Sequence, residues 1–314
     1  MSKEGKMRFE DYVEKIQTLD IQGAENVAKA AMHAVLEVIE ETKDWQISDI
    51  KRRLKNCSEI LRKTRPTEPA MMNSLNYSLH FSDFPKQSQA EKHKLIEEII
   101  KRINFVLKHF EESDEIIAEI GEKKIKKNSV VYTHCHSSTV MRIIKRAWDK
   151  GTRFEVFCTE TKPHYQGRRT AIELSEHGIP VTYFIDSAAR IAIKKADIML
   201  IGADAITNEG KIINKIGSEL FSFVASTYDV PVYACTNSWK FDPHSVFGYE
   251  VNIEEAEKAD FWHDAPEKVM INRLMFERVD PKYLSGVISE LGIYSPVVFS
   301  EEIKRKYDWF FKKA

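Results

Sequence analysis

The sequence predicts an α/β protein in two parts: an N-terminal helical domain over residues 1–127, then a Rossmann-like, doubly wound parallel-sheet domain over residues 128–314. Two observations predict this division. Before residue 128 the apolar residues recur at helical spacing, most clearly over residues 24–41. After it, short β-type apolar runs alternate with helical patterns, a rhythm typical of βαβ units in a parallel sheet.

In the first part the apolar periodicity predicts a series of amphipathic helices. The segment Arg65-Pro66-Thr67 ends one of them, because proline cannot continue a helix and restrains the residue before it. A loop is expected at residues 83–87. The expected helices cover residues 24–41, 47–63, 69–79, 88–110 and 113–127.

In the second part the strands are short and the helices follow them. Strands are expected at residues 130–133, 154–158, 181–185, 198–201 and 232–235. Helices are expected at residues 140–148, 168–177, 187–195 and 218–228. Residues 207–210 predict a tight turn between two short strands, and residues 241–277 look irregular. Asp280-Pro281 predicts the cap and first turn of a helix near residues 282–291.

Composition excludes several classes of function. The formal net charge of −1 gives no global field for nucleic acid or an anionic membrane. No apolar run reaches the roughly 20 residues of a membrane span, and no GxGxxG fingerprint of a nicotinamide dehydrogenase is present. The first residues lack the apolar core of a signal peptide. We therefore expect a cytoplasmic protein with reduced thiols and no direct contact with nucleic acid or membrane.

Polar and charged residues gather where the predicted strands end, which is where open parallel sheets bind ligands. The loops expected there are residues 134–139, 160–167, 186–187, 202–204 and 236–240. Cations concentrated near one edge of a neutral protein favour a small phosphorylated ligand over a polymer. The cations in or near these loops are Lys162, Arg168, Arg169, Lys215 and Lys240.

The stretch VVYTHCHSSTV places Cys135 between a strand and a helix start. Such a thiol could be a nucleophile, a general acid or base, or a buried packing residue. A helix start lowers the pKa of a nearby thiol, and flanking His134 and His136 would act in the same direction if protonated. These two histidines could also bind a metal, but no further ligand has matching spacing. We expect one to pack and the other to form a hydrogen bond, and we expect Cys158 and Cys235 to pack.

Asp204 follows the buried run IMLIGA. A carboxylate in this place is a helix cap, a turn former or a catalytic group with a raised pKa. Capping has weak support because residues 205–210 do not look helical. Further along, Lys215 could be a phosphate-binding cation or a surface charge, and Ser218 could cap the helix that follows.

A set of motifs occurs in one order along the chain: THCHSSTV, TETKPHYQGRRTA, DSAAR, GADAIT, INKIGS and WKFDP. Together with IQGAENVAKAA and TRPT in the first part, they resemble the family that unites ribose-1,5-bisphosphate isomerase, methylthioribose-1-phosphate isomerase and the alpha, beta and delta subunits of translation initiation factor 2B. Each motif is weak by itself, but the ordered set is specific and covers most of the chain.

The resemblance implies that Cys135 and Asp204 are a catalytic acid–base pair, which the regulatory subunits generally lack. THCHS and DSAAR are more similar to the ribose-bisphosphate branch than to the methylthioribose branch. The implied sugar-phosphate ligands are Gln22, Gly23, Ala24, Arg65, Ser137, Asn214, Lys215 and Lys240. Gln22 departs from the family, whose isomerases usually have arginine there. Lys29 or Arg65 would have to compensate for the missing charge, or the phosphate affinity or the substrate differs.

The implied activity is isomerisation of ribose 1,5-bisphosphate to ribulose 1,5-bisphosphate in AMP salvage, with no metal or organic cofactor. The resemblance also implies a homodimer or a hexamer built from dimers, and AMP or another nucleotide as an effector. The alternative is a non-catalytic regulatory subunit that binds nucleotide or sugar phosphate together with initiation factor 2. Such a subunit would need the phosphate pocket but not the thiol.

Overall fold

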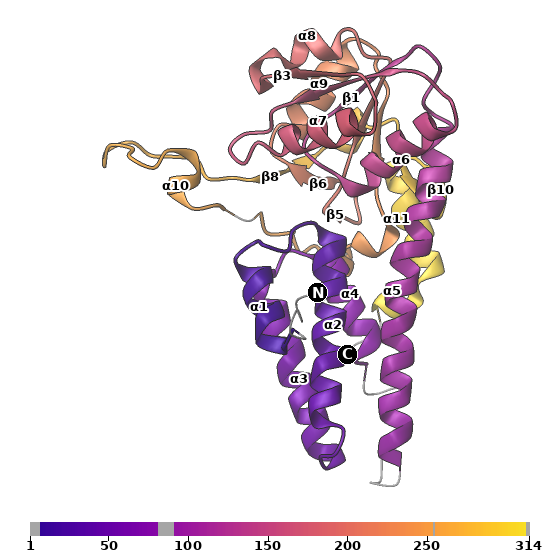
Figure 1. Ribbon diagram of the computed structural model, residues 1–314, viewed down its shortest axis with the longest axis vertical. Helices are drawn as coiled ribbons and strands as arrows, with labels where there is room; N and C mark the ends of the chain where they lie inside the picture. Colours follow the sequence, from indigo (N-terminus) through magenta and orange to yellow (C-terminus); the bar gives the residue numbers. More distant parts are fainter. Residues whose placement is uncertain (1–6, 81–90, 254, 312–314) are drawn as a thin grey trace. The chain divides into compact units, whose positions relative to one another are not determined.

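The computed structural model describes residues 7–80, 91–253 and 255–311 (Figure 1). Contacts divide the chain into two compact units, Met1–Glu112 with Tyr307–Ala314, and Ser113–Lys306. We call them the helical unit and the sheet unit. The predicted fold class is confirmed, whereas a domain boundary between residues 127 and 128 stays a prediction. None of the helices in the described ranges combines the length and apolar character that crossing a membrane requires.

The helical unit is built around α2 (Ala24–Thr42), which packs against its neighbours α1, α3 and α4. Ala28, Ala31 and Ala34 on α2 are completely buried, and their small side chains let the neighbouring helices approach closely. The helices predicted at residues 24–41, 47–63 and 69–79 are confirmed, but α1 was not predicted, and the loop predicted at residues 83–87 lies outside the described residues. The remaining helices are α1 (Phe9–Gln17), α3 (Ile47–Thr64), α4 (Pro69–Ser78) and the first part of α5 (Lys92–Glu122).

The prediction of two separate helices at residues 88–110 and 113–127 is wrong, because no break separates them and the helix ends at Glu122. One continuous helix, α5, runs from Lys92 to Glu122. Ser113 and Asp114 looked like a helix start, since both residue types favour caps. Asp114 instead forms an ion pair with Arg142 Nε at 3.2 Å. A polar residue that finds such a partner can remain inside a helix.

The sheet unit contains a seven-stranded sheet in the order β10-β9-β7-β4-β1-β2-β3. Every pairing in it is parallel except that of β10 with β9. The strands predicted in this part are confirmed to within a residue or so, and β9 and β10 are additional. The strands are β1 (Val130–Thr133), β2 (Glu155–Thr159), β3 (Val181–Phe184), β4 (Ile198–Ile201), β7 (Val232–Cys235), β9 (Gly286–Ser289) and β10 (Gly292–Tyr294).

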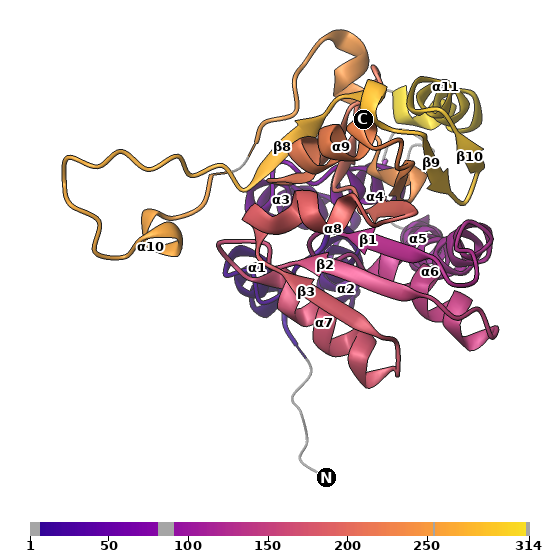
Figure 2. The same cartoon turned by 90° about the horizontal axis from the view of Figure 1, so that it is seen from above.

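Helices cover both faces of this sheet (Figure 2). Alternate residues of β1 show the two layers: Val131 belongs to the core beneath α6 and α7, whereas the Tyr132 ring meets Phe221 of α9 edge-on at 6.2 Å. The sheet is therefore doubly wound, as the sequence predicts. The helices are α6 (Ser138–Asp149) and α7 (Gln166–Glu176) on one face, and α8 (Ala189–Ile193) and α9 (Ser218–Thr227) on the other.

The helix predicted near residues 282–291 is wrong. Asp280 does act as a cap, because its carboxylate accepts a hydrogen bond from Lys282 N at 3.0 Å. Only one 3-10 turn follows, η6 (Pro281–Tyr283), and the chain then enters β9 beside β7. All four residues of β9 are buried, so pairing in the sheet outweighs the local helix signal. The helix α11 (Pro296–Lys306) was not predicted.

A second, smaller sheet follows β4. It has the antiparallel order β5-β6-β8, from β5 (Ala205–Ile206), β6 (Ile212–Lys215) and β8 (Phe276–Val279). Between β6 and β8, the described part of residues 241–275 holds only short elements such as η5 (Pro243–Phe247) and α10 (Lys258–Phe261), so the expectation of an irregular segment is confirmed there up to β8.

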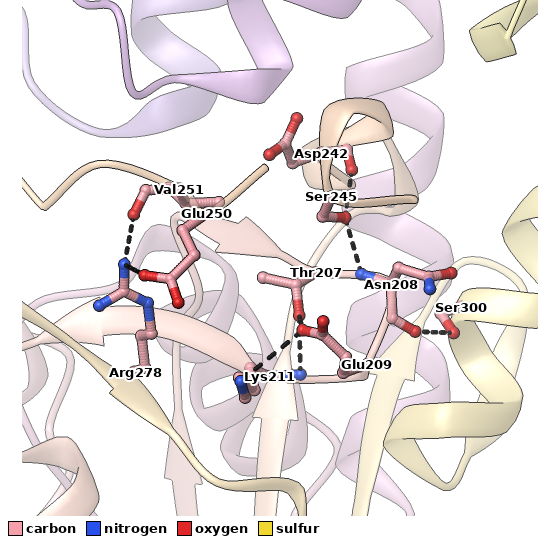
Figure 3. A network of polar contacts seen from close by, with 10 residues as sticks. All are labelled: Thr207, Asn208, Glu209, Lys211, Asp242, Ser245, Glu250, Val251, Arg278 and Ser300. Atoms are coloured by element: carbon pink, nitrogen blue, oxygen red, sulfur yellow. Dashed lines mark hydrogen bonds and ion pairs between the residues drawn. The ribbon is translucent and has the colours of Figure 1, made fainter. Parts of the chain in front are cut away.

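The turn between β5 and β6 is confirmed, and it is held at several points (Figure 3). Thr207 Oγ1 accepts a hydrogen bond from Lys211 N at 3.2 Å. Asn208 donates its N–H to Ser245 Oγ at 2.8 Å, and its carbonyl accepts from Ser300 Oγ at 2.8 Å. The hairpin is thus tied to η5 and α11, which fixes the position of β6.

Candidate active site

The site lies where the strand order reverses. From β1 the chain proceeds to β2 and β3 on one side, and β4 then pairs with β1 on the other side. Loops that leave parallel strands at such a switch point form the usual ligand crevice of an open α/β sheet. Cys135 follows β1 and Asp204 follows β4. The topology therefore brings the predicted pair onto neighbouring loops.

The backbone of Cys135 is unusual and firmly held. Its φ of 68° lies in the left-handed region, which is uncommon for residues other than glycine. Its N–H donates to Thr161 Oγ1 at 3.0 Å, and its carbonyl accepts from Thr170 Oγ1 at 2.8 Å. Both threonines are buried. Hydrogen bonds on both sides of the residue stabilise a conformation that costs energy by itself.

The thiol of Cys135 is a proton donor. It is buried and donates to Gln166 Oε1, at the start of α7, over 3.3 Å. Burial raises its pKa to about 11, although the nearby Lys215 ammonium acts in the opposite direction and the Asp204 carboxylate adds to the rise. The helix start was expected to lower this pKa, but burial has the larger effect, so the thiol keeps its proton at neutral pH.

The two flanking histidines are neutral and hydrogen-bonded. His134 Nε2 is 2.9 Å from the Ile216 carbonyl, which can only accept, so this nitrogen carries the hydrogen. Its Nδ1 therefore accepts from Thr159 Oγ1 at 2.8 Å. His136 Nδ1 contacts Thr170 Oγ1 at 3.1 Å. Burial lowers the pKa of each imidazole to about 4, so neither acts on the thiol as a cation.

The expectation that one histidine packs and the other forms a hydrogen bond is wrong, because both form hydrogen bonds. These bonds also occupy both ring nitrogens of His134. Across the described ranges, no group of three or more His, Cys, Asp and Glu side chains is arranged to hold a metal ion.

Asp204 caps no helix, because β5 begins directly after it. Its N–H donates to the Ile213 carbonyl at 2.8 Å, which fixes the backbone. Its side chain is half-buried, and the described residues give its carboxylate neither a hydrogen bond nor an ion pair. The geometry leaves this carboxylate available to exchange a proton with a ligand.

Gly202 lets the loops after β1 and β4 touch. A Cβ at this position would lie 2.8 Å from Ser137 Cβ and Oγ, and 3.9 Å from Asn214 Oδ1. Ser137 caps α6 by accepting from Val140 N at 3.4 Å, and Asn214 Nδ2 donates to Ser218 Oγ at 2.9 Å. The structure thus brings Ser137 and Asn214 together beside the Asp204 loop.

Two buried lysines complete this part of the site. Lys215, at the end of β6, is 4% exposed, and its Nζ lies 4.3 Å from the centre of the Phe276 ring. Lys240 is 8% exposed and donates to the Ala203 carbonyl at 2.7 Å. No carboxylate of the described residues lies within ion-pair distance of either. A buried ammonium without a counter-ion is costly, so both suit an anionic ligand.

The other cations predicted for this edge differ in character. Lys162, Arg168 and Arg169 are exposed, and the Arg168 guanidinium stacks 3.9 Å from the centre of the Tyr165 ring. Lys215 and Lys240 are therefore the buried members of the predicted set. Cys158 and Cys235 are completely buried, as expected for packing residues.

The remaining predicted residues belong to the helical unit. Gly23 precedes α2 with a φ of 87°, and the exposed Gln22 accepts a hydrogen bond on its carbonyl from Asn26. Ala24 is the first residue of α2. The cations considered as replacements for a charge at Gln22 both have acid partners: Arg65 pairs with Glu68 at 2.6 Å and Lys29 with Glu25 at 2.5 Å.

Three residues that hold Cys135 were not predicted from the sequence: Thr161, Gln166 and Thr170. They lie within the motif TETKPHYQGRRTA, of which only the cations were predicted to belong to the site. Threonine and glutamine are common in loops, and the hydrogen bonds that two of them make to a backbone leave no trace in residue spacing. The order of the motifs was the one signal that could have pointed to this segment.

Residues 20–296 match the sequence profile of the Initiation factor 2 subunit family. The chain is 33% identical over 307 residues to the ribose 1,5-bisphosphate isomerase of Thermococcus kodakarensis, covering 96% of this chain and 95% of that protein. It is equally similar, at 33% over 310 residues, to the ribose 1,5-bisphosphate isomerase of Pyrococcus furiosus, with 96% and 95% covered. A solved structure described as the Pyrococcus horikoshii translation initiation factor eIF-2B superposes with a TM-score of 0.79 at 27% identity, covering 92% and 97%.

Proposed function

The chain belongs to the Initiation factor 2 subunit family, and from that premise we propose that it is an isomerase that converts ribose 1,5-bisphosphate to ribulose 1,5-bisphosphate. The observation that carries the proposal is the pairing of a protonated, rigidly held Cys135 thiol with an available Asp204 carboxylate at the switch point. Two relatives named for this activity, each 33% identical over nearly the whole chain, support it.

The chemistry requires one proton donor and one proton acceptor. The C1 phosphate prevents spontaneous ring opening, so the bond between C1 and the ring oxygen breaks only as that oxygen gains a proton. Cys135 supplies this proton. Asp204 takes the proton from the C2 hydroxyl as the C2 carbonyl forms, and the hydrogen on C2 ends on C1, either through an enediol or as a hydride. One proton enters and one leaves, so the reaction balances without an external oxidant or reductant.

The buried lysines bind the phosphate groups in this proposal. Lys215 and Lys240 lack acid partners within the described ranges, and Asn214 and Ser137 lie nearby with groups that hydrogen-bond to phosphate oxygens. From the resemblance, Gln22, Gly23, Ala24 and Arg65 also contribute to substrate binding. Gln22 donates a hydrogen bond without the charge of arginine, so we expect a weaker grip on phosphate there.

The test is turnover of ribose 1,5-bisphosphate, followed by phosphorus NMR. Wild type should form ribulose 1,5-bisphosphate. Cys135→Ser and Asp204→Asn should each reduce kcat by about 10²- to 10⁴-fold, the usual range for loss of a general acid or base. No turnover by a folded wild-type protein would contradict the proposal, whereas turnover that survives both substitutions would contradict only the assigned mechanism.

The regulatory alternative predicts a different result. A regulatory subunit would bind nucleotide and initiation factor 2 without isomerising the sugar, and it would not need the thiol. The buried Cys135, with its thiol bonded to Gln166 and its backbone held by Thr161 and Thr170, favours the enzyme. Capture of initiation factor 2 without any turnover would favour the regulator.

We also propose the setting that the resemblance implies. The enzyme would act in the cytoplasm in AMP salvage, as a homodimer or a hexamer of dimers, with AMP or another nucleotide as effector. The phosphorylated sugar is the partner that the named activity of the relatives supports.

A further inference from the structure

Cys135 is not the only residue of the site with an unusual backbone. Thr161, in the loop after β2, also has a positive φ, 59°, which is rare for a β-branched residue. The two residues are joined directly, because Cys135 N–H donates to Thr161 Oγ1 at 3.0 Å. Two strained residues that support each other must themselves be held by a third group.

That third group is the carboxylate of Asp186. Asp186 begins η3 (Asp186–Ala188) after β3. Its Oδ1 accepts from Thr161 N at 2.9 Å, and its Oδ2 accepts from Lys162 N at 2.8 Å. Each oxygen binds a backbone N–H, and such charge-assisted bonds are stronger than neutral ones. The carboxylate therefore fixes the peptide groups on either side of Thr161.

We propose that Asp186 is a positioning residue for Cys135, acting through Thr161. Asp186 fixes the Thr161 backbone, the Thr161 hydroxyl fixes the Cys135 N–H, and the thiol is thereby kept at the switch point between β1 and β4. Asp186 needs no contact with the substrate for this role. The inference rests on the proposed function, because it assigns Asp186 a part in the same reaction.

A purely structural role for Asp186 makes different predictions. A carboxylate that merely stabilises a loop changes the stability of the protein, but its effect on turnover does not depend on Thr161. The chain offers a matched control in Asp197, whose Oδ2 accepts from Val130 N at 2.8 Å, where β1 begins. Asp197→Asn removes a similar backbone contact at the start of β1, whereas Cys135 follows its end.

The first experiment is a kinetic double-mutant cycle. Asp186→Asn keeps the shape but turns an NH₂ group toward a backbone N–H, and Thr161→Val removes the hydroxyl. Each should reduce kcat by roughly ten- to a hundredfold, with little change in KM, because a misplaced catalytic group slows the chemical step. The double variant should be no slower than the slower single variant. Thr161→Ser, which restores the hydroxyl, and Asp197→Asn should stay near wild type.

The second experiment needs no turnover. Alkylation of Cys135 by iodoacetamide at pH 9 is followed by peptide mass spectrometry. Asp186→Asn and Thr161→Val should raise the rate at Cys135 by about three- to tenfold, because release of the backbone exposes the thiol and increases its thiolate fraction. Asp197→Asn and Thr161→Ser should leave the rate unchanged.

The outcomes separate the two proposals. Absence of turnover in wild type contradicts the proposed function, and the alkylation rates then decide the role of Asp186. Additive losses of kcat in the double variant, or alkylation rates that neither Asp186→Asn nor Thr161→Val alters, overturn the positioning role. If Asp186→Asn does not fold, the pair Thr161→Val and Thr161→Ser decides, and equal behaviour of the two overturns it.

Discussion

The two units differ in whether their buried cations have acid partners among the described residues. In the helical unit, Arg65 forms an ion pair with Glu68 at 2.6 Å, and both side chains are buried. In the sheet unit, Lys215 and Lys240 are equally buried, yet no acid of the described residues pairs with them. A paired cation contributes to the fold. An unpaired one is kept at a cost to the fold, which a bound anion offsets.

The difference therefore separates a cation whose charge an acid partner already balances from cations whose charge a bound anion would balance. Substitution of a paired cation should lower stability, because the acid partner stays behind as a buried charge. Substitution of an unpaired cation should leave stability equal or higher and should weaken ligand binding.

Arg65→Met should lower the free energy of unfolding by about 3–5 kcal/mol, because Glu68 loses a buried counter-ion. Urea unfolding followed by circular dichroism measures the change. The double variant Arg65→Met, Glu68→Gln should be more stable than the single variant, since it also removes the buried charge of Glu68. A loss below about 1 kcal/mol, typical of exposed pairs, would show that this ion pair does not stabilise the helical unit.

Lys215→Met should impair activity without lowering the stability of the protein. We expect kcat/KM for ribose 1,5-bisphosphate to fall by about a hundredfold, equivalent to roughly 3 kcal/mol, while the melting temperature stays equal or rises. Lys211→Met, four residues earlier in the chain, is the control, because Lys211 is half-exposed and lies 3.8 Å from the Glu209 carboxylate. A marked loss of stability in Lys215→Met would show that Lys215 stabilises the fold, as Arg65 does, and would contradict the difference between the two units.

A pH titration asks whether the histidines add to the positive charge of the site. Burial lowers the pKa of His134 to about 4 from its ordinary 6.5. The imidazole of the unfolded chain gains a proton near pH 6.5, whereas that of the folded protein gains one only near pH 4. The free energy of unfolding therefore stays at its full value above pH 6.5 and falls by roughly 3 kcal/mol as the pH decreases toward 4. Unfolding free energies measured from pH 7 to pH 4 should show this decline, and His134→Asn should flatten it. Stability that rises on acidification would mean that the imidazole is held as a cation.

The sequence predicts the sheet and the place of the site, but only part of the difference between the two kinds of cation. The alternation of strands and helices predicted the sheet unit and its edge, and the positions of Cys135 and Asp204 just after two strands predicted their proximity. The pairing of Arg65 with Glu68 was also within reach, since the two lie three residues apart. The resemblance points to a phosphate contact for Arg65 and gives no sign of this ion pair.

Other features depend on contacts that sequence spacing cannot show. The break predicted at Ser113 failed because a partner far along the chain, Arg142, stabilises Asp114 within the helix. The helix predicted after Pro281 failed because β9 gains a place beside β7. The pKa of Cys135 was expected to fall because a helix start is visible in the sequence, whereas burial, which outweighs it, is not.

Inorganic phosphate should stabilise the protein through Lys215 and Lys240, which have no acid partner among the described residues. At about ten times its dissociation constant, a bound anion adds roughly 1.4 kcal/mol to the free energy of unfolding, which thermal unfolding detects. Lys240→Met should reduce or abolish this gain, because it removes a buried ammonium beside the Asp204 loop. Lys211→Met should keep it. An equal gain in wild type and in Lys240→Met would place the phosphate elsewhere.

The smallest expected effect concerns Gln22, where the sequence departs from the isomerases it resembles. Lys29 and Arg65 each have an acid partner, so neither is a free substitute for the missing charge. Gln22→Arg should lower KM for ribose 1,5-bisphosphate about fivefold, close to 1 kcal/mol, because a charged donor binds phosphate more strongly than an amide. Since phosphate binding at this position is shared by substrate and transition state, kcat should not change. Gln22→Lys should give a smaller decrease, because lysine cannot bind in bidentate fashion. If both variants keep the wild-type KM, residue 22 does not contact phosphate, and Lys215 and Lys240 carry the binding without it.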